Sequence, residues 1–555
     1  MFRSWSRSHA ASLLRIEVTL GLILTALIIG LHFLHLLHAG GFWRDETSAI
    51  QLGLMPSLSQ VWSHLNFDSF PILLSIVLRA WSGLGLQSDF SFRILGLLVG
   101  LTVLPVLWWN ARQLSGSAPI VALLLFALSP VTLRWGDSLR AYGLGIFFVL
   151  LFLGLTWKLI QRQTRLICSV ATLAAVLAVQ SLYQDAFVIG AICLGGLVVT
   201  LRRRNFRTSG LIVVTGIPAA LSLLPYWGLV TRAREWNVVA EAPIDLPRMA
   251  QVLRDALSAP NDFALCLWAI FGAAALLSCC FLLSKPSSPV AGDDTDLGCF
   301  LCTITVATTI SYYLFLKLLN FQTETWYYLV WMAIVAVAID SLLSRALRDH
   351  WSLTLRLGFA VLAATLLLPE NAELARTRMT NGDLIARHLS QVASKDDFIL
   401  VHPWFSAVTF HRYYSGQAKW STLPPISDFE VQRHDLFKQQ IERNQPLRPV
   451  IEQLERTLRS GHDVWVVGYL PFSMPPRPAP HLEPGRQTET GWRGGPFMMA
   501  FGMEAAYYVQ THSLRIEAIP IKVSDPVNSY ERQRLARISG WQPDPRSGNA
   551  VVLGN

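Results

Sequence analysis

Two adjacent carboxylates, Asp45 and Glu46, follow Arg44 directly after the first long apolar block, in the stretch HAGGFWRDETSAI. A carboxylate placed at the proton of an acceptor hydroxyl can act as a general base, which accelerates a reaction about 10²–10⁴-fold. Neighbouring residues point about 100° apart on a helix and to opposite faces of a strand, so we expect only one acid to touch a reacting hydroxyl. Acids in such a place can equally be solvated loop charges.

A second group of charged residues stands between two later apolar blocks, in LSPVTLRWGDSLRAYG at 128–143. Arg134, Asp137 and Arg140 lie close together there, and ionisable groups that border a bilayer are costly and usually functional. Arginine binds phosphate well, although it also reaches lipid headgroups without a catalytic role. Asp68 in HLNFDSFP and Asp185 in SLYQD are further acidic candidates.

The composition predicts the two domains that must position these residues. The chain has 555 residues, 52% hydrophobic and 15% charged, and its mean hydropathy is +0.39. Long apolar blocks continue to about Glu370, which predicts a transmembrane domain over 1–370 and a soluble domain over 371–555. The net charge of +9 comes with Arg residues gathered in short loops, a pattern of membrane orientation that argues against nucleic-acid binding.

The apolar blocks predict eleven spans, since each needs roughly twenty apolar residues. They lie near 17–38, 93–111, 117–134, 140–158, 166–183, 186–201, 208–229, 263–284, 297–317, 324–343 and 351–369. The first is expected to be an uncleaved span rather than a signal peptide. The basic loops at 158–165, 202–207 and 344–350 then share the side of the Arg-bearing N-terminus, which we assign to the cytoplasm.

The segment 69–84 decides the orientation of everything after it. It is apolar but only sixteen residues long, and Ser75, Arg79 and Ser82 draw one narrow polar stripe along it. We therefore predict an amphipathic helix in the membrane interface. The soluble domain and the first loop, from about 39 to 92, are then outside the membrane.

Four groups of unusual residues converge on this outer side. They are WRDE with HLNFDSFP in the first loop, LSPVTLRWGDSLRAYG in the second, SLYQD in the third, and NFQTETWYYL at 320–329.

The ordered set of motifs resembles the C-type membrane glycosyltransferases, in particular the bacterial relatives of dolichyl-phosphate-mannose protein mannosyltransferases and of aminoarabinose transferase. The resemblance rests on the acidic pair after the first span, the Pro-containing amphipathic helix, the span that opens SFRILGLLVG, and ALSPVTLRWGDSLRAYGLGIFF. It covers roughly the first 230 residues; the later spans agree in layout only.

The sequence departs from the pattern of these relatives at two places. Ser69-Phe70-Pro71 stands where relatives often have His-Pro-Pro, and 136–140 reads GDSLR where many have Ser-Gln-Glu-Ala-Arg. Arg140 and Tyr142 are kept, but Ser138 replaces the Glu. Whether Asp137 takes over the role of that Glu is open at this point.

The resemblance implies a reaction outside the cytoplasmic membrane, where no nucleotide pool exists, and no phosphate-cradling Gly-rich motif occurs in the chain. The donor would be a sugar on a polyprenyl phosphate, whose departing phosphate needs cations more than a general acid. The resemblance implies Asp45 as the base, with Glu46 orienting it or holding the acceptor, and inversion at the anomeric carbon. Arg44, Asp68, Arg134, Asp137, Arg140, Tyr142 and Asp185 are the candidate substrate ligands.

These expectations amount to a hexosyl- or mannosyl-type transferase, multi-pass in the inner membrane of a cell envelope. Its acceptor would be a glycan, a lipid or a protein. A transporter or lipid flippase is the alternative, although the charges gather at one face and no internal repeat is visible. A non-catalytic scaffold is a third reading. We expect no cofactor, and leave open a divalent metal, which paired carboxylates can bind.

The soluble domain is expected to be a small α/β layer. A helix followed by a buried strand occurs twice, around FILVH and again in VIEQLERTLRSGHDVWVVGYL, which favours a parallel strand pair. All seven cysteines lie in or beside apolar blocks before this domain, so it has no disulfide framework or zinc motif. A supporting or acceptor-positioning role is the expectation.

Overall fold

A computed structural model describes residues 2–232, 245–284, 291–319, 323–347, 350–485 and 493–543. The chain divides into two compact units. A helical unit contains Met1–Leu37, Phe70–Trp227 and Pro243–Arg376, and a sheet unit contains His38–Ser69, Gly228–Ala242 and Thr377–Asn555. The first part of the first loop, with its acidic pair, therefore belongs to the same unit as the C-terminal segment.

The helical unit is that of a multi-pass membrane protein, as predicted. Within the described residues, nine helices are long and apolar enough to cross a membrane. They are Leu14–His38, Asp89–Leu114, Tyr142–Gln161, Asp185–Arg202, Phe206–Arg232, Asp262–Ser284, Asp293–Leu318, Thr325–Ala346 and Trp351–Ala375. The predicted span at 166–183 forms a shorter apolar helix, Arg165–Ser181, so the count of eleven stays a prediction.

The predicted span at 117–134 is not one continuous helix. It is divided into α7 (Ile120–Ala122), a π-helical stretch (Leu123–Ala127) and α8 (Pro130–Gly136). Pro130 opens α8 and Ser129 before it is extended, with ψ 132°. A residue before proline is disfavoured in the helical region, so the helix must break there.

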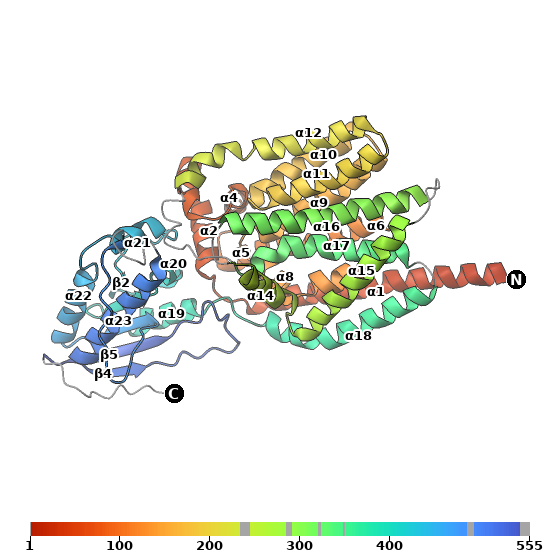
Figure 1. Ribbon diagram of the computed structural model, residues 1–555. Helices are drawn as coiled ribbons and strands as arrows, with labels where there is room; N and C mark the ends of the chain where they lie inside the picture. Colours follow the sequence, from red (N-terminus) through yellow and green to blue (C-terminus); the bar gives the residue numbers. More distant parts are fainter. Residues whose placement is uncertain are drawn as a thin grey trace. The chain divides into compact units, whose positions relative to one another are not determined.

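The remaining helices of this unit pack as a bundle in which α9 contacts α6, α10 and α11, and α11 contacts α16. Figure 1 shows α9, α10, α11, α12 and α16 running side by side. Their bounds are α1 (Phe2–His38), α4 (Leu73–Gly83), α5 (Asp89–Leu101), α6 (Val103–Leu114), α9 (Tyr142–Gln161), α10 (Arg165–Ser181), α11 (Asp185–Arg202), α12 (Phe206–Leu221), α14 (Leu246–Leu257), α15 (Asp262–Ser284), α16 (Ala291–Leu319), α17 (Leu329–Ala346) and α18 (His350–Ala375). The eleven residues of α4 reach about 16 Å, too short to cross a bilayer.

The sheet unit is a five-stranded sheet with the order β2-β1-β3-β5-β4. The strands are β1 (Phe398–His402), β2 (Lys419–Thr422), β3 (Val464–Gly468), β4 (Ser513–Ala518) and β5 (Leu535–Trp541). The first three are parallel, and β5 pairs antiparallel with β3 and β4. The helices are α19 (Gly382–Val392), α20 (Ala407–Tyr413), α21 (His434–Ile441), α22 (Arg448–Arg459) and α23 (Gly494–His512).

Helices cover both faces of this sheet, which explains the unbroken apolar sequences of β1 and β3. Alternate residues of β1 point to opposite faces: Ile399 packs with α19 and α20, and Leu400 packs with α21, α22 and α23. The predicted parallel pair is confirmed, since Phe398 lies opposite Val464.

The first loop is built into the sheet unit through α2 (Arg44–Leu54), α3 (Leu58–His64) and the turn before them. The Met379 N–H donates to the Ala39 carbonyl at 2.7 Å. Gly40 has φ +66°, and a Cβ there would lie 2.3 Å from the Arg378 guanidinium carbon. Gly40 thus lets the chain pass closely over Arg378 and turn towards α2, and Gly41 after it leaves room for Asp383, which would lie 2.7 Å from an added Cβ.

Candidate active site

Glu46 is a helix cap rather than an open carboxylate. It is the third residue of α2, fully buried, and its Oε2 accepts a hydrogen bond from the Trp43 N–H at 3.4 Å. This is the return bond of a capping box, which satisfies a backbone donor that the helix leaves unpaired. Glu46 therefore fixes the start of α2.

Asp45 is the carboxylate of the pair that solvent can reach. Its side chain is 22% exposed, and its Oδ1 accepts a hydrogen bond from Gln432 Nε2 at 2.6 Å. The Nε of Arg44 lies 3.6 Å from the same oxygen. Both contacts hold the Asp45 carboxyl group in one orientation.

Arg44 is clamped between an acid and an aromatic ring. Its Nη1 donates to Glu531 Oε1 at 2.7 Å, and its guanidinium carbon lies 4.4 Å from the centre of the Phe405 ring. Burial raises the pKa of Glu531 to about 7, although the nearby Arg44 charge opposes the shift. Sequence reasoning missed Glu531, because it lies 487 residues from Arg44.

His434 is a second group that the sequence did not indicate. Its ring stands edge-on to Trp404, with centroids 5.0 Å apart. Burial lowers the pKa of His434 to about 4, and the Asp45 charge only partly opposes this. The imidazole is therefore neutral at neutral pH.

Asp68, also expected to bind substrate, serves a turn in the same unit. Its Oδ1 accepts a hydrogen bond from the Ser69 N–H at 2.7 Å. Phe67 before it lies under Arg433, whose guanidinium carbon is 4.9 Å from the ring centre. The 428–435 segment therefore contacts the first loop at two points. Arg433 lies over Phe67, and Gln432 donates a hydrogen bond to Asp45.

Arg140 and Tyr142 share one aromatic partner in the helical unit. The Arg140 guanidinium carbon lies 4.1 Å from the centre of the Phe70 ring, and Tyr142 meets that ring edge-on at 5.3 Å. Both are buried. The unusual SFP sequence and the LRAY sequence are thus in contact. Arg134, in the last turn of α8, is half-buried.

Asp137 is paired with a histidine of the first helix. Both of its carboxylate oxygens lie 2.8 Å from His32 Nδ1, and both residues are buried. A Cβ at Gly100 of α5 would lie 1.8 Å from Asp137 Oδ1, so α5 needs a glycine to admit the carboxylate. Ser138, which replaces the expected Glu, donates to the Trp135 carbonyl at 2.7 Å. The only sequence signal for His32 is a polar residue in an apolar span.

Asp185 is the most isolated of the predicted ligands. It opens α11 and is fully buried, and within the part of the chain that the structure describes neither carboxylate oxygen has a hydrogen-bond partner. A Cβ at Gly145 would lie 2.6 Å from its Oδ2. An ionised carboxylate without partners is costly in such surroundings, so Asp185 needs a proton or a bound group.

Three of the four motif groups meet inside the helical unit. Trp135 from the second loop packs on Trp326 with centroids 4.3 Å apart. Gln184 from the third loop donates to Tyr312, which in turn bonds the Tyr327 carbonyl. Residues 320–322 of the fourth group lie outside the described residues, and Glu324 is half-buried.

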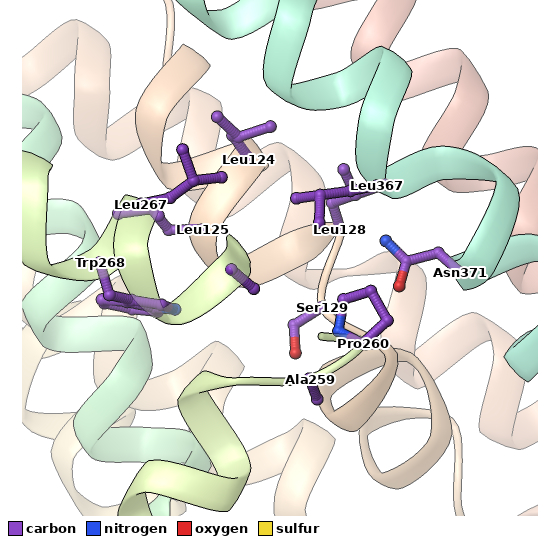
Figure 2. A pocket seen from close by; sticks show the side chains of 11 residues that line it. Leu124, Leu125, Leu128, Ser129, Ala259, Pro260, Leu267, Trp268, Leu367 and Asn371 are labelled. Carbon is purple, nitrogen blue, oxygen red and sulfur yellow. The ribbon is translucent and has the colours of Figure 1, made fainter. Parts of the chain in front are cut away.

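A small cavity of about 10 Å³ lies at the break between the π-helical stretch and α8. Figure 2 shows the Ser129 hydroxyl and the Asn371 amide near Pro260, with Leu124, Leu125, Leu267 and Leu367 on the other sides. The space fits about one water molecule. It is too small for a sugar or a lipid headgroup.

The described residues contain no group of three or more His, Cys, Asp or Glu side chains placed to hold a metal ion.

No protein-family model matches the sequence, and no curated protein matches it. Solved structures with a similar arrangement include an oligosaccharyltransferase of Archaeoglobus fulgidus in complex with Zn and sulfate, with 13% identity over 81% of this chain and 67% of that chain, and a TM-score of 0.49. The oligosaccharyltransferase AglB of that organism, in complex with an inhibitory peptide and a dolichol-phosphate, has 10% identity over 90% of this chain and 72% of that chain, with a TM-score of 0.47.

ArnT from Cupriavidus metallidurans bound to undecaprenyl phosphate is also similar, with 14% identity over 80% of this chain and 92% of that chain, and a TM-score of 0.39. ArnT is the aminoarabinose transferase that the sequence motifs resemble.

Proposed function

We propose that this protein is a glycosyltransferase of the cytoplasmic membrane that moves a sugar of the hexosyl or mannosyl type. The donor is a polyprenyl phosphate, and the acceptor hydroxyl is presented on the outer face. The observation that carries the proposal is the division of labour at the start of α2. Glu46 is buried as a cap, while Asp45 is partly exposed and oriented by Gln432 and Arg44.

The proposed step is a single displacement. Asp45 takes the proton of the acceptor hydroxyl as its oxygen bonds to the anomeric carbon, and the bond from that carbon to the lipid phosphate oxygen breaks. The bonding electrons leave with the phosphate, and attack from the opposite face inverts the anomeric carbon. His434, neutral beside Asp45, adds no positive charge that would weaken the base.

The donor phosphate is assigned to arginines of the helical unit. Arg140 is buried and held over the Phe70 ring, and such an enclosed guanidinium stabilises a developing phosphate charge more strongly than one in water. We assign Arg134 and Tyr142 as supporting ligands of the same phosphate. Asp137 is assigned a positioning role, because its carboxylate is engaged by His32.

Donor binding to the Arg140→Ala variant tests this assignment. Losing a charge-assisted contact to phosphate should cost on the order of 2–3 kcal/mol, so we expect markedly weaker binding of undecaprenyl phosphate. The matched control is Arg112→Ala, since Arg112 lies exposed near Trp108 in the last turn of α6. Equal affinity in the two variants would contradict the role given to Arg140.

A further inference from the structure

The sheet unit contains a groove of about 410 Å³, and Arg44 is the one lining residue to which the proposed reaction gives a role. Its described lining residues are Arg44, Pro403, Phe405, Gly468, Tyr469, Tyr530, Arg532, Gln533 and Arg534. All of them belong to this one unit. We call it the arginine groove.

The arginine groove lies where two parallel strands end. Residues 403–405 follow β1, and Gly468 is the last residue of β3. In α/β sheets, ligands bind beyond the carboxyl ends of parallel strands. Gly468 has φ +104°, and a Cβ there would lie 1.7 Å from the His402 carbonyl oxygen. This glycine keeps the two strand ends close together and leaves the groove open.

One wall of the groove is an extended segment that leads into β5. Side chains of such a segment alternate between its faces. Arg532 and Arg534 are exposed, whereas Glu531 before them and Leu535 after them are buried and Gln533 between them is half-buried. Both arginines, with Gln533 between them, line the groove, whereas Glu531 is buried and accepts a hydrogen bond from Arg44 Nη1 at 2.7 Å.

The groove therefore combines positive charge with aromatic surface. It has three arginines, and none of its described lining residues is acidic. Arg534 lies over Tyr469, with its guanidinium carbon 5.6 Å from the ring centre. Guanidinium groups bind carboxylates and phosphates through paired hydrogen bonds. Aromatic rings such as Tyr469 and Phe405 offer flat apolar surface.

We propose that the arginine groove binds an anionic sugar chain, the acceptor of the transfer, through its carboxylate or phosphate groups. Arg44 connects the groove with the proposed base, because its Nε lies 3.6 Å from Asp45 Oδ1. An acceptor held by Arg532 and Arg534 is thus anchored beside the group that takes its proton. The inference names the acceptor class of the proposed reaction and rests on that proposal.

Titration calorimetry of the full chain in detergent tests this. The probes are trigalacturonate, which carries carboxylates, mannopentaose phosphate, which carries phosphate, and neutral galactotriose. We expect one of the anionic probes, but not galactotriose, to bind with an affinity that falls as salt is raised. Arg532→Ala and Arg534→Ala should each weaken that binding about tenfold. The control Arg456→Ala, at an exposed position of α22, should leave it unchanged.

The anionic probe that binds identifies the acceptor charge as carboxylate or phosphate. Equal binding of galactotriose, binding that is unaffected in both groove variants, or no binding of either anionic probe would overturn the inference. So would groove variants that lose only their binding to phosphatidylglycerol vesicles, because the groove would then contact lipid.

Asp45→Asn separates this inference from the proposed function. The variant should bind the anionic probe as the parent does, since Asp45 does not line the groove. Arginine-dependent binding of the anionic probe by a parent protein that transfers no sugar would leave the groove assignment standing and reject the transferase. Sugar transfer by the parent, with unchanged probe binding in the groove variants, would keep the transferase and reject the groove assignment.

Discussion

At the scale of single residues, the first turn of α2 separates two neighbouring acids by depth. Glu46 closes the helix from inside, and Asp45 stands one position earlier with part of its surface exposed. Around them, Arg44 donates a hydrogen bond to Glu531 on its buried side. We expect the Asp45 carboxylate to shift when any one of these contacts is lost.

Glu531→Gln should change how stability depends on pH. The pKa of Glu531 is raised to about 7 from 4.5 by burial. Its protonation therefore stabilises the fold fully below about pH 4.5, and this contribution is lost as pH rises through 7. The loss is on the order of 3 kcal/mol. Gln cannot ionise, so the thermal unfolding midpoint of the variant should fall less between pH 5 and pH 8.

The comparison must be made against the parent in the same detergent, because other groups titrate in this range. His434 has the opposite effect on stability. Because burial lowers its pKa from 6.5 to about 4, its contribution to the stability of the fold is lost as pH falls below 6.5. Parallel curves for parent and Glu531→Gln would show that Glu531 does not titrate as described.

At the scale of elements, the sequence predicts best those segments that their own run of apolar residues identifies. The apolar runs of β1 and β3 are buried on both faces and were found, whereas β2 is exposed at its start and was missed. The span at 117–134 was expected as one helix, although Pro130 already marked the break.

The pairings between distant segments could not be predicted in this way. Asp137 and His32 are 105 residues apart, and Asp45 and Gln432 are 387 residues apart. Nothing in the type or spacing of these residues specifies a partner. The candidate residues were therefore predictable by type, but their roles depend on contacts that only the fold creates.

Gly100→Ala tests how closely α5 is fitted to Asp137. The added Cβ would lie 1.8 Å from Asp137 Oδ1 and 3.4 Å from His32 Cε1, so the carboxylate must move away from its histidine. We expect a destabilisation of about 1–3 kcal/mol and weaker binding of undecaprenyl phosphate. Thermal unfolding and donor titration in detergent measure the two effects.

Gly272→Ala is the matched control, because it lies inside α15 with no atom within 4 Å of the new Cβ. Alanine favours a helix over glycine by about 1 kcal/mol, so this variant should be at least as stable as the parent. If Gly100→Ala behaves like Gly272→Ala, α5 does not constrain Asp137.

At the scale of the whole molecule, the proposal divides its parts between the units. The assigned phosphate ligands Arg134 and Arg140 belong to the helical unit, and Asp45 belongs to the sheet unit. The reaction requires the sheet unit to be outside the membrane. The predicted topology meets this requirement if the 69–84 segment lies in the membrane interface and does not cross the membrane. This segment contains the short helix α4.

Cysteine labelling tests the sidedness. A single Cys placed at Ser394 or Ser460, both exposed in the sheet unit, should react with an impermeant maleimide in intact spheroplasts. A Cys at the exposed Arg162, in a predicted cytoplasmic loop, should react only after permeabilisation. The opposite pattern would place the sheet unit inside the cell and remove the basis of the catalytic assignments.

The most direct test is sugar transfer by the purified Asp45→Asn protein from a polyprenyl-phosphate sugar. Asn keeps the shape of the side chain but cannot take the acceptor proton, so the rate should fall about 10²-fold or more while donor affinity stays unchanged. Glu46→Gln, which alters the cap of α2, should lower the rate less. A parent that transfers sugar, together with an Asp45→Asn variant of near-normal turnover, would contradict the assignment of Asp45 as the base.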